Sequence, residues 1–128
     1  MKILLDTHVF IWWDSEPQSL SATALDLCRD PDNVLLLSIA SVWEMEIKRQ
    51  LGKLTLRTPL AEIVEKQHSE NGLILLDVQL PHVLRLETLP AIHKDPFDRI
   101  LVAQALVEGA TLVTVDSAIR QYPAPVLW

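Results

Sequence analysis

Short apolar runs alternate with longer segments of helical spacing along the whole chain, and this alternation limits the folds open to it. The first run lies in "KILLDTH" at 2–8, where Ile and Leu stand in a row, as is typical of a strand buried on both faces. Strands that alternate with helices indicate right-handed crossovers and a mostly parallel sheet. The predicted strands are 3–5, 33–38, 72–77, 111–116 and 124–128.

The segments between these strands carry apolar residues at helical spacing. The segment at 95–109 is the clearest, with Asp95 as N-cap, Pro96 at the first helical position and Gly109 at the C-terminal stop. A length of 128 residues with 49% hydrophobic content suits one domain with a real core. We therefore predict a single three-layer α/β/α domain over residues 1–128, around a mostly parallel sheet of about five strands. The predicted helices are 19–30, 39–54, 58–72, 79–89 and 95–109.

The composition limits the possible binding partners and the cellular location of the protein. The formal net charge of −6 argues against binding nucleic acid through a broad basic surface, so such a role needs a local site or bound cations. No apolar run approaches the ~20 residues of a membrane span, and we expect no membrane partner. Because Cys28 is the single cysteine, no internal disulfide is possible, which fits a cytoplasmic location.

Two aspartates directly follow predicted strands. Asp6 ends the first strand and Asp116 ends the run at 111–116. In open parallel sheets, ligands bind beyond the carboxyl ends of the strands, at the point where the strand order reverses. Each aspartate has a simpler interpretation as the N-cap of a following helix, and the sequence leaves both interpretations open.

Two further carboxylates lie on the apolar stripes of predicted helices. Glu44 has apolar neighbours at helical spacing, and Asp98 shares its stripe with residues such as Leu101. The simpler interpretation of Glu44 is an ion pair with Lys48, four residues on, worth ~0.3–0.5 kcal/mol. For Asp98 the alternative is a capping turn with Asp95. We assign Asp95 itself to helix capping rather than to the site.

Four carboxylates at one edge of a sheet repel one another unless a cation lies among them. Oxygen ligands without cysteine or an obligatory histidine suit Mg²⁺ or Mn²⁺ better than zinc. Such ions activate water and stabilise the oxygens of a phosphodiester under attack. They also let an acidic protein hold a phosphate backbone, because they invert the local charge.

Four pieces of the sequence resemble PIN-domain ribonucleases of the VapC toxin type, from type II toxin–antitoxin systems. They follow the order of the family and span nearly the whole chain. The resemblance implies a metal-dependent endoribonuclease that uses Mg²⁺ or Mn²⁺ to cleave RNA. It also implies a homodimer and an inhibitory antitoxin partner that blocks the acidic pocket. The matching pieces are "LLDTH" at 4–8, "SVWEMEIKRQLGKL" at 41–54, "HKDPFDRILVAQAL" at 93–106 and "LVTVD" at 112–116.

Carried over residue by residue, the resemblance also implies the catalytic and metal-binding residues. Thr114 matches the hydroxyl residue of the family near the last acid, and Asp95 is adjacent to the site. Lys48 and Arg99 are weaker candidates, for phosphate contacts or for holding the acids in place. The implied acidic site consists of Asp6, Glu44, Asp98 and Asp116.

Several other side chains carry a functional and a structural interpretation. His8 and His93 are candidates to orient substrate, although a lone histidine is more often structural. The adjacent Trp12 and Trp13 cannot both face inward easily, so they are either half core and half surface or a docking groove for a partner helix. Trp128 is expected to close the last strand against the core.

Other acidic or nucleotide-binding classes fit the sequence less well. A receiver domain needs paired acids near the first strand and a lysine after the last, and both are missing. A phosphatase of the haloacid dehalogenase type needs a second aspartate where His8 stands. Nucleotide-binding motifs need a glycine-rich turn, which three scattered glycines do not form. The remaining alternative is a non-catalytic RNA-binding or scaffold protein that has kept the PIN fold.

Overall fold

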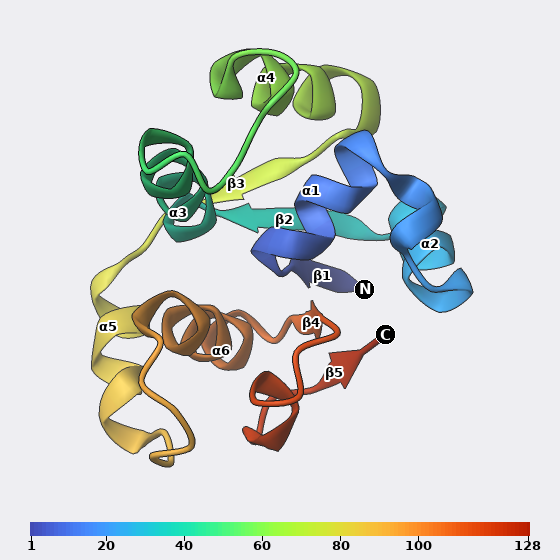
Figure 1. Cartoon of the computed structure of the whole chain (residues 1–128). Coiled ribbons are helices and arrows are strands. Elements are labelled where there is room, and N and C mark those ends of the chain that lie inside the picture. Colours follow the sequence, from blue (N-terminus) through green and yellow to red (C-terminus); the bar gives the residue numbers. More distant parts are fainter.

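The computed structural model describes residues 1–128 and has one sheet of five parallel strands. The strand order is β3-β2-β1-β4-β5, so the first strand of the chain lies in the middle (Figure 1). This confirms the predicted parallel sheet. The strands are β1 (Lys2–Leu5), β2 (Val34–Ser38), β3 (Ile74–Leu76), β4 (Thr111–Val113) and β5 (Val126–Leu127).

Helices cover both faces of the sheet. The α-helices are α1 (Thr7–Ser15), α2 (Ala22–Arg29), α3 (Ile39–Gln50), α4 (Leu60–Asn71), α5 (Leu80–Arg85) and α6 (Pro96–Glu108). Three short 3-10 helices join them, η1 (Pro17–Ser19), η2 (Leu86–Thr88) and η3 (Ile119–Gln121). None of these helices is long and apolar enough to cross a membrane.

Alternating residues of the central strands enter two separate cores. In β1, Ile3 and Leu5 face the core formed with α1 to α4, while Leu4 faces the core formed with α6 and η3. In β2, Leu36 likewise faces the second core. This period of two is the strand geometry, and it confirms the three-layer α/β/α architecture (Figure 1).

Caps and stops define most helix ends as the sequence predicts. The side chain of Asp95 accepts from the backbone N–H of Phe97 at 2.9 Å and starts α6. Gly72 and Gly109 end α4 and α6 in the left-handed conformation, at φ 69° and 64°.

Two predicted elements differ from the structure. The expected helix over 79–89 ends after six residues as α5 and continues only as the 3-10 turn η2. The nine-residue helix α1, which covers Trp12 and Trp13, was not among the predicted helical segments. Its residues are apolar on nearly every face, because α1 packs between the sheet and neighbouring helices, so its sequence shows little helical periodicity.

The strand order creates a switch point between β1 and β4. From β1 the chain first adds β2 and β3 on one side, then returns to add β4 and β5 on the other. The carboxyl ends of β1 and β4 therefore lie side by side, with Leu5 in register with Val113. This edge is where open parallel sheets bind ligands.

Candidate active site

Asp6 leaves the carboxyl end of β1 and is 5% exposed. It stands at the N-cap position of α1, yet its side chain makes no capping hydrogen bond. Instead Asp6 Oδ2 accepts a hydrogen bond of 2.7 Å from the hydroxyl of Thr114, just beyond β4. Burial raises the pKa of Asp6, while the bond from Thr114 acts against that rise. The capping interpretation of this side chain is therefore wrong.

Asp116 lies close to the same strand ends. Its backbone N–H donates to the Thr114 hydroxyl at 3.0 Å, so Thr114 joins Asp116 to Asp6. The side chain of Asp116 closes the turn before η3, where Oδ1 accepts from the backbone N–H of Ala118 at 2.8 Å. The N-cap of η3 is Ala118 and no side chain caps it, so the capping interpretation of Asp116 is wrong. Oδ2 makes no hydrogen bond within the chain.

Glu44 points inward from α3 and is 7% exposed, as its place on the apolar stripe predicts. Both of its oxygens have partners. Oε1 accepts from the Thr7 hydroxyl at 2.7 Å, and Oε2 lies 2.9 Å from the ammonium group of Lys48. The predicted ion pair is therefore present, and it reaches a buried carboxylate rather than a solvated one.

Asp98 lies in the first turn of α6, where Asp95 already caps the helix. The side chain of Asp98 is thus free to turn outward from the helix end, and its Oδ2 lies 3.0 Å from His93 Nε2. Burial, opposed by the hydrogen bond from His93 and aided by the negative charges of Asp95, Asp6 and Asp116, raises the pKa of Asp98 to about 6.

These pKa effects show that the acids share one electrostatic environment. Asp98 on α6 is affected by Asp6 and Asp116 at the strand ends, and Asp6 is affected by Glu44 on α3. Helices α3 and α6 contact one another, which closes this edge of the sheet from both layers. The structure therefore brings the predicted acids to one edge of the sheet.

The four acidic side chains have the ligand chemistry that a hard cation needs, but their oxygens do not surround a single point. Their ligand atoms would all be carboxylate oxygens, which Mg²⁺ and Mn²⁺ prefer. However, no three Asp, Glu, His or Cys side chains converge closely enough to hold one ion. Both oxygens of Glu44 have partners, so ion binding there requires Lys48 or Thr7 to give way, whereas His93 occupies only Oδ2 of Asp98 and leaves Oδ1 free.

The weaker candidates lie around the acids in different roles. Arg99 points away from Asp98, as expected, and donates to the backbone oxygen of Pro90 at 2.9 Å and to the hydroxyl of Tyr122 at 3.0 Å. His8 is exposed, and its charge lowers the pKa of Asp6.

Sequence reasoning missed three polar side chains at this edge. Thr7 bonds Glu44, the hydroxyl of Ser41 lies 2.9 Å from that of Thr7, and Tyr122 bonds His93. The position of Thr7 directly after Asp6 was a usable signal. Tyr122 lies in an irregular segment that carries no pattern, so nothing in the sequence pointed to it.

The interpretation of Trp12 and Trp13 as half core and half surface is confirmed. Both rings are partly buried, Trp12 against Trp128 at 6.0 Å and Trp13 against Phe10 at 6.5 Å. The contact with Trp12 packs Trp128 against the first core, as expected.

The exposed indole is that of Trp43 on α3, at 61%. It borders an apolar hollow of about 430 Å³ lined by Ile39, Ala40, Val78, Pro96, Phe97 and Ile100.

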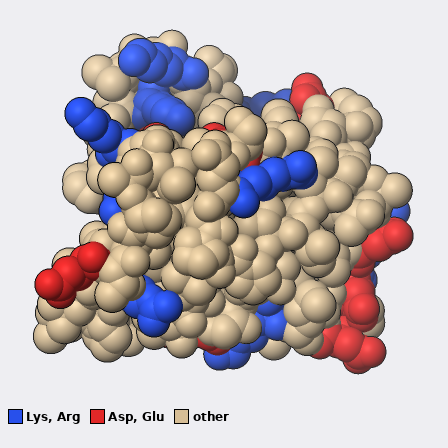
Figure 2. All heavy atoms as spheres, turned by 90° about the horizontal axis from the view of Figure 1, so that it is seen from below, with Lys and Arg blue, Asp and Glu red and all other residues tan.

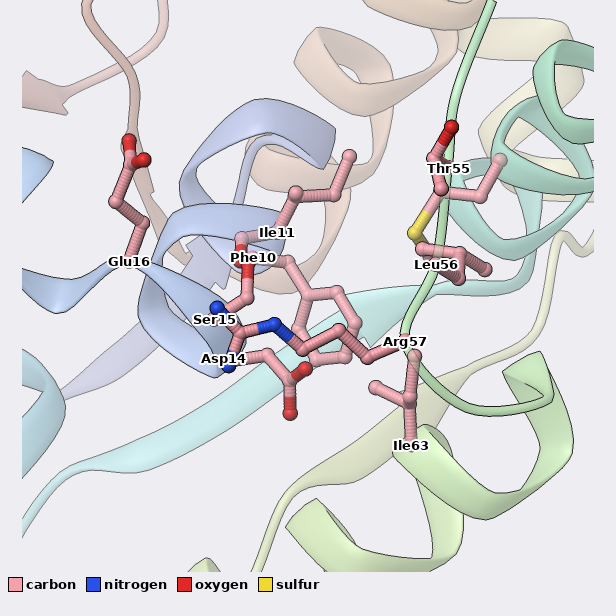
Figure 3. Close-up of a pocket in the computed structure, with 10 residues that line it drawn as sticks. Phe10, Ile11, Asp14, Ser15, Glu16, Thr55, Leu56, Arg57 and Ile63 are labelled. Carbon is pink, nitrogen blue, oxygen red and sulfur yellow. Dashed lines mark hydrogen bonds between the residues drawn. The ribbon is translucent and has the colours of Figure 1, made fainter. Parts of the chain in front are cut away.

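A smaller pocket of about 140 Å³ lies away from the acids. It opens between α1, the segment at 55–57 and Ile63 of α4, and none of the predicted acids lines it. Figure 3 shows Arg57 reaching across it toward Asp14 on α1. On the face drawn in Figure 2, Lys and Arg side chains lie in separate groups, and acidic side chains lie along the right edge and at two further places on the rim. This face carries no continuous basic surface.

Comparisons with known proteins agree with this geometry. Residues 3–125 match the family described as PIN domain. Ribonuclease VapC22 of Mycobacterium tuberculosis is 30% identical over 97% of this chain and 95% of its own length. A chain in the crystal structure of VapBC2 from Rickettsia felis, bound to a DNA fragment from its promoter, has a TM-score of 0.75 at 16% identity, with 99% and 98% of the two chains covered.

A second solved structure has the same fold. It is that of FitAcB from Neisseria gonorrhoeae, with a TM-score of 0.59 at 19% identity, covering 98% of this chain and 96% of its own. These structural similarities extend over the whole sheet and both helical layers. The family match covers nearly the whole length of the protein. The chain therefore belongs to the PIN-domain family, in its VapC-type branch.

Proposed function

We propose that the chain is an endoribonuclease that depends on Mg²⁺ or Mn²⁺ and acts as the toxin of a type II toxin–antitoxin pair. The observation that carries the proposal is the group of buried and partly buried acids at the switch point, where burial and then neighbouring negative charges raise the pKa of Asp98 to about 6. The name of the relative Ribonuclease VapC22 supports RNA as the substrate.

Asp6, Glu44, Asp98 and Asp116 are the residues that would hold the ion. When bound, a divalent cation activates water and stabilises the oxygens of a phosphodiester during hydrolysis. The protein itself contributes the dry, fixed surroundings: Thr114 holds one oxygen of Asp6, and Thr7 holds one oxygen of Glu44. Lys48 neutralises Glu44 in the metal-free protein. Arg99 remains outside the acidic group, which does not support a direct contact with phosphate.

RNA binding by this acidic protein rests on local charge. The net charge is −6, and the face in Figure 2 has no continuous basic surface. A cation held by the acids supplies positive charge at the point where a phosphate must bind. RNA binding is therefore expected to depend on the divalent ion more strongly than on the general salt concentration.

The proposed partner is a small antitoxin that covers the acidic site. The VapBC2 and FitAcB structures support this, because each name joins two components. We also propose a homodimer, which light scattering of the purified chain tests, and a cytoplasmic site of action, which the single Cys28 fits. Expression of the intact chain alone is expected to arrest growth, and co-expression of the antitoxin to relieve the arrest. Harmless expression of active chain would contradict the toxin role.

Cleavage of end-labelled RNA by the purified chain tests the enzyme proposal. We expect fragments in Mn²⁺ and none in EDTA. The Asp98→Asn variant and the Asp6→Asn/Asp116→Asn double variant should lose cleavage, together with the rise in melting temperature that Mn²⁺ causes by binding the folded state. Asp26→Asn, on the exposed face of α2, is the matched control and should behave as wild type. RNA binding without cleavage in any metal would favour the non-catalytic alternative, an RNA-binding or scaffold protein.

A further inference from the structure

We propose that His93, Tyr122 and Arg99 form a positioning relay that holds one oxygen of Asp98 and leaves the other oxygen free to bind a cation. The proposal rests on the function proposed above and adds three side chains to its site.

A continuous chain of hydrogen bonds joins the residues. Arg99 Nη1 donates to the Tyr122 hydroxyl at 3.0 Å, and this hydroxyl lies 2.7 Å from His93 Nδ1. On the other side of the ring, His93 Nε2 lies 3.0 Å from Asp98 Oδ2. The imidazole therefore bridges the last irregular segment of the chain and the first turn of α6.

The direction of each hydrogen bond follows from the donors available. A guanidinium can only donate, so the Tyr122 oxygen accepts from Arg99 and its own proton is left for another acceptor. The nearest acceptor is His93 Nδ1 at 2.7 Å. With Nδ1 accepting, the neutral ring carries its proton on Nε2, which then donates to Asp98. The other acceptor near the hydroxyl, the His93 backbone oxygen, lies farther away at 3.5 Å, so the short contact to Nδ1 sets the tautomer.

Packing keeps this chain of bonds in place. Tyr122 is 4% exposed, with the Arg99 guanidinium 5.8 Å from the centroid of its ring. Arg99 is itself held by the backbone oxygen of Pro90 at 2.9 Å. His93 lies in an irregular loop before α6, so no regular element fixes its ring, and the contact with Tyr122 at 5.5 Å between centroids does so instead.

The two carboxylate oxygens of Asp98 therefore have different roles. Oδ2 is held by His93, whereas Oδ1 makes no hydrogen bond within the chain and is available to a ligand. Outer partners of this kind orient metal-binding carboxylates, and their loss typically costs about 10- to 100-fold in metal affinity or activity. A held carboxylate presents one oxygen in one direction instead of sampling several rotamers.

Mn²⁺ affinity, measured by electron paramagnetic resonance of the free ion in titrations without RNA, tests the relay. We expect His93→Leu to weaken Mn²⁺ binding by about 10-fold or more, and Tyr122→Phe by a smaller factor, because the ring then loses the donor that fixes its tautomer. His93→Gln keeps an N–H donor near the position of Nε2 and should recover most of the affinity. In cleavage assays kcat should fall while the KM for RNA stays near wild type.

His68→Leu is the matched control, because its ring also bonds one atom, the Leu73 oxygen at 2.7 Å, but on α4. It should leave Mn²⁺ affinity unchanged. Tyr122→Phe removes one hydroxyl only, so it keeps the test valid if His93→Leu fails to fold. Equal losses in His93→Gln and His93→Leu would overturn the donor role. If Asp98→Asn weakens Mn²⁺ binding but His93→Leu does not, the relay is wrong while the proposed site stands. If Asp98→Asn has no effect, the proposed site itself is wrong.

Discussion

The indole of Trp43 meets the ring of Phe97 edge-on, with the two centroids 5.3 Å apart and the planes at 77°. Each of these residues directly precedes one of the predicted acids: Trp43 precedes Glu44, and Phe97 precedes Asp98. The contact joins α3 to α6 across the sheet edge where the acids lie. It therefore sets the separation of two carboxylates that come from different helices.

Removing the contact between Trp43 and Phe97 should destabilise the packing of α3 against α6 at the edge of the sheet where the acids lie. In a double-mutant cycle of Trp43→Ala and Phe97→Ala, we expect a coupling free energy of about 0.5–1.5 kcal/mol, the usual value for an edge-to-face pair. Urea unfolding of the four proteins measures it. Both single variants should also bind Mn²⁺ less tightly. Trp12→Ala, which breaks the contact with Trp128, should lower stability without changing Mn²⁺ affinity.

The metal-free protein should become less stable as the pH rises from about 4 to 6. The pKa of Asp98 is 3.8 in the unfolded chain and about 6 in the fold, so the folded state binds more protons within this window. The free energy of unfolding therefore falls through the window and stays low above it. Asp98→Asn removes this loss and, in EDTA at pH 7.5, should be more stable than wild type by on the order of 1 kcal/mol.

Urea midpoints in EDTA at pH 4.5 and 7.5 check this prediction. The gain from Asp98→Asn should be small at the lower pH and larger at the higher one. The same preparations should lose cleavage in Mn²⁺, so stability and activity change in opposite directions. An Asp98→Asn variant that is less stable at pH 7.5 and still cleaves RNA would mean that this carboxylate is structural.

Replacing Lys48 should lower the stability of the metal-free protein but raise its affinity for Mn²⁺. Its ammonium lies 2.9 Å from the buried carboxylate of Glu44 and is the cation nearest to that group in the metal-free protein. In EDTA, Lys48→Met should lower the free energy of unfolding by about 0.5–1 kcal/mol, since the pair is half-exposed on the lysine side. Mn²⁺ should bind this variant more tightly because the competing charge is gone. Weaker Mn²⁺ binding would show that Lys48 supports the ion instead.

Cys28 should resist alkylation until the chain unfolds. It is 7% exposed on α2, and burial raises the pKa of its thiol to about 11. At pH 8 the folded protein thus holds almost no thiolate, which is the reactive form. Iodoacetamide labelling followed by mass spectrometry should be slow in buffer and fast in urea. Rapid labelling in buffer would show that α2 opens readily.

The sequence predicts the fold well where local signals agree with the packing. The run at 3–5 and the segment at 95–109 carry strong strand and helix patterns, and both form as predicted. The strand-end position of Asp6 and the inward stripe of Asp98 were also visible, because they depend only on element type and spacing. Their assignment as metal ligands stays a prediction.

The remaining features depend on how distant segments dock. The bond from Thr114 to Asp6 joins residues 108 positions apart, and nothing local favours it over a cap at Asp6. The partners of His93 likewise depend on where the irregular segment around Tyr122 packs. The exposure of Trp43 on α3 likewise had no local signal, whereas Trp12 on α1 packs partly against the first core.

Because β1 lies in the middle of the sheet, the sheet and the acidic edge can assemble only late in translation. Asp6 leaves the ribosome early, but its neighbour β4 and the Thr114 hydroxyl follow only near the end of synthesis. Until then β1 has an open edge on that side, and the nascent chain lacks Asp116. The acidic edge therefore cannot assemble on a partly made chain. With the proposed site, RNA cleavage therefore has to wait until the last part of the chain is made, which gives an antitoxin until chain release to bind.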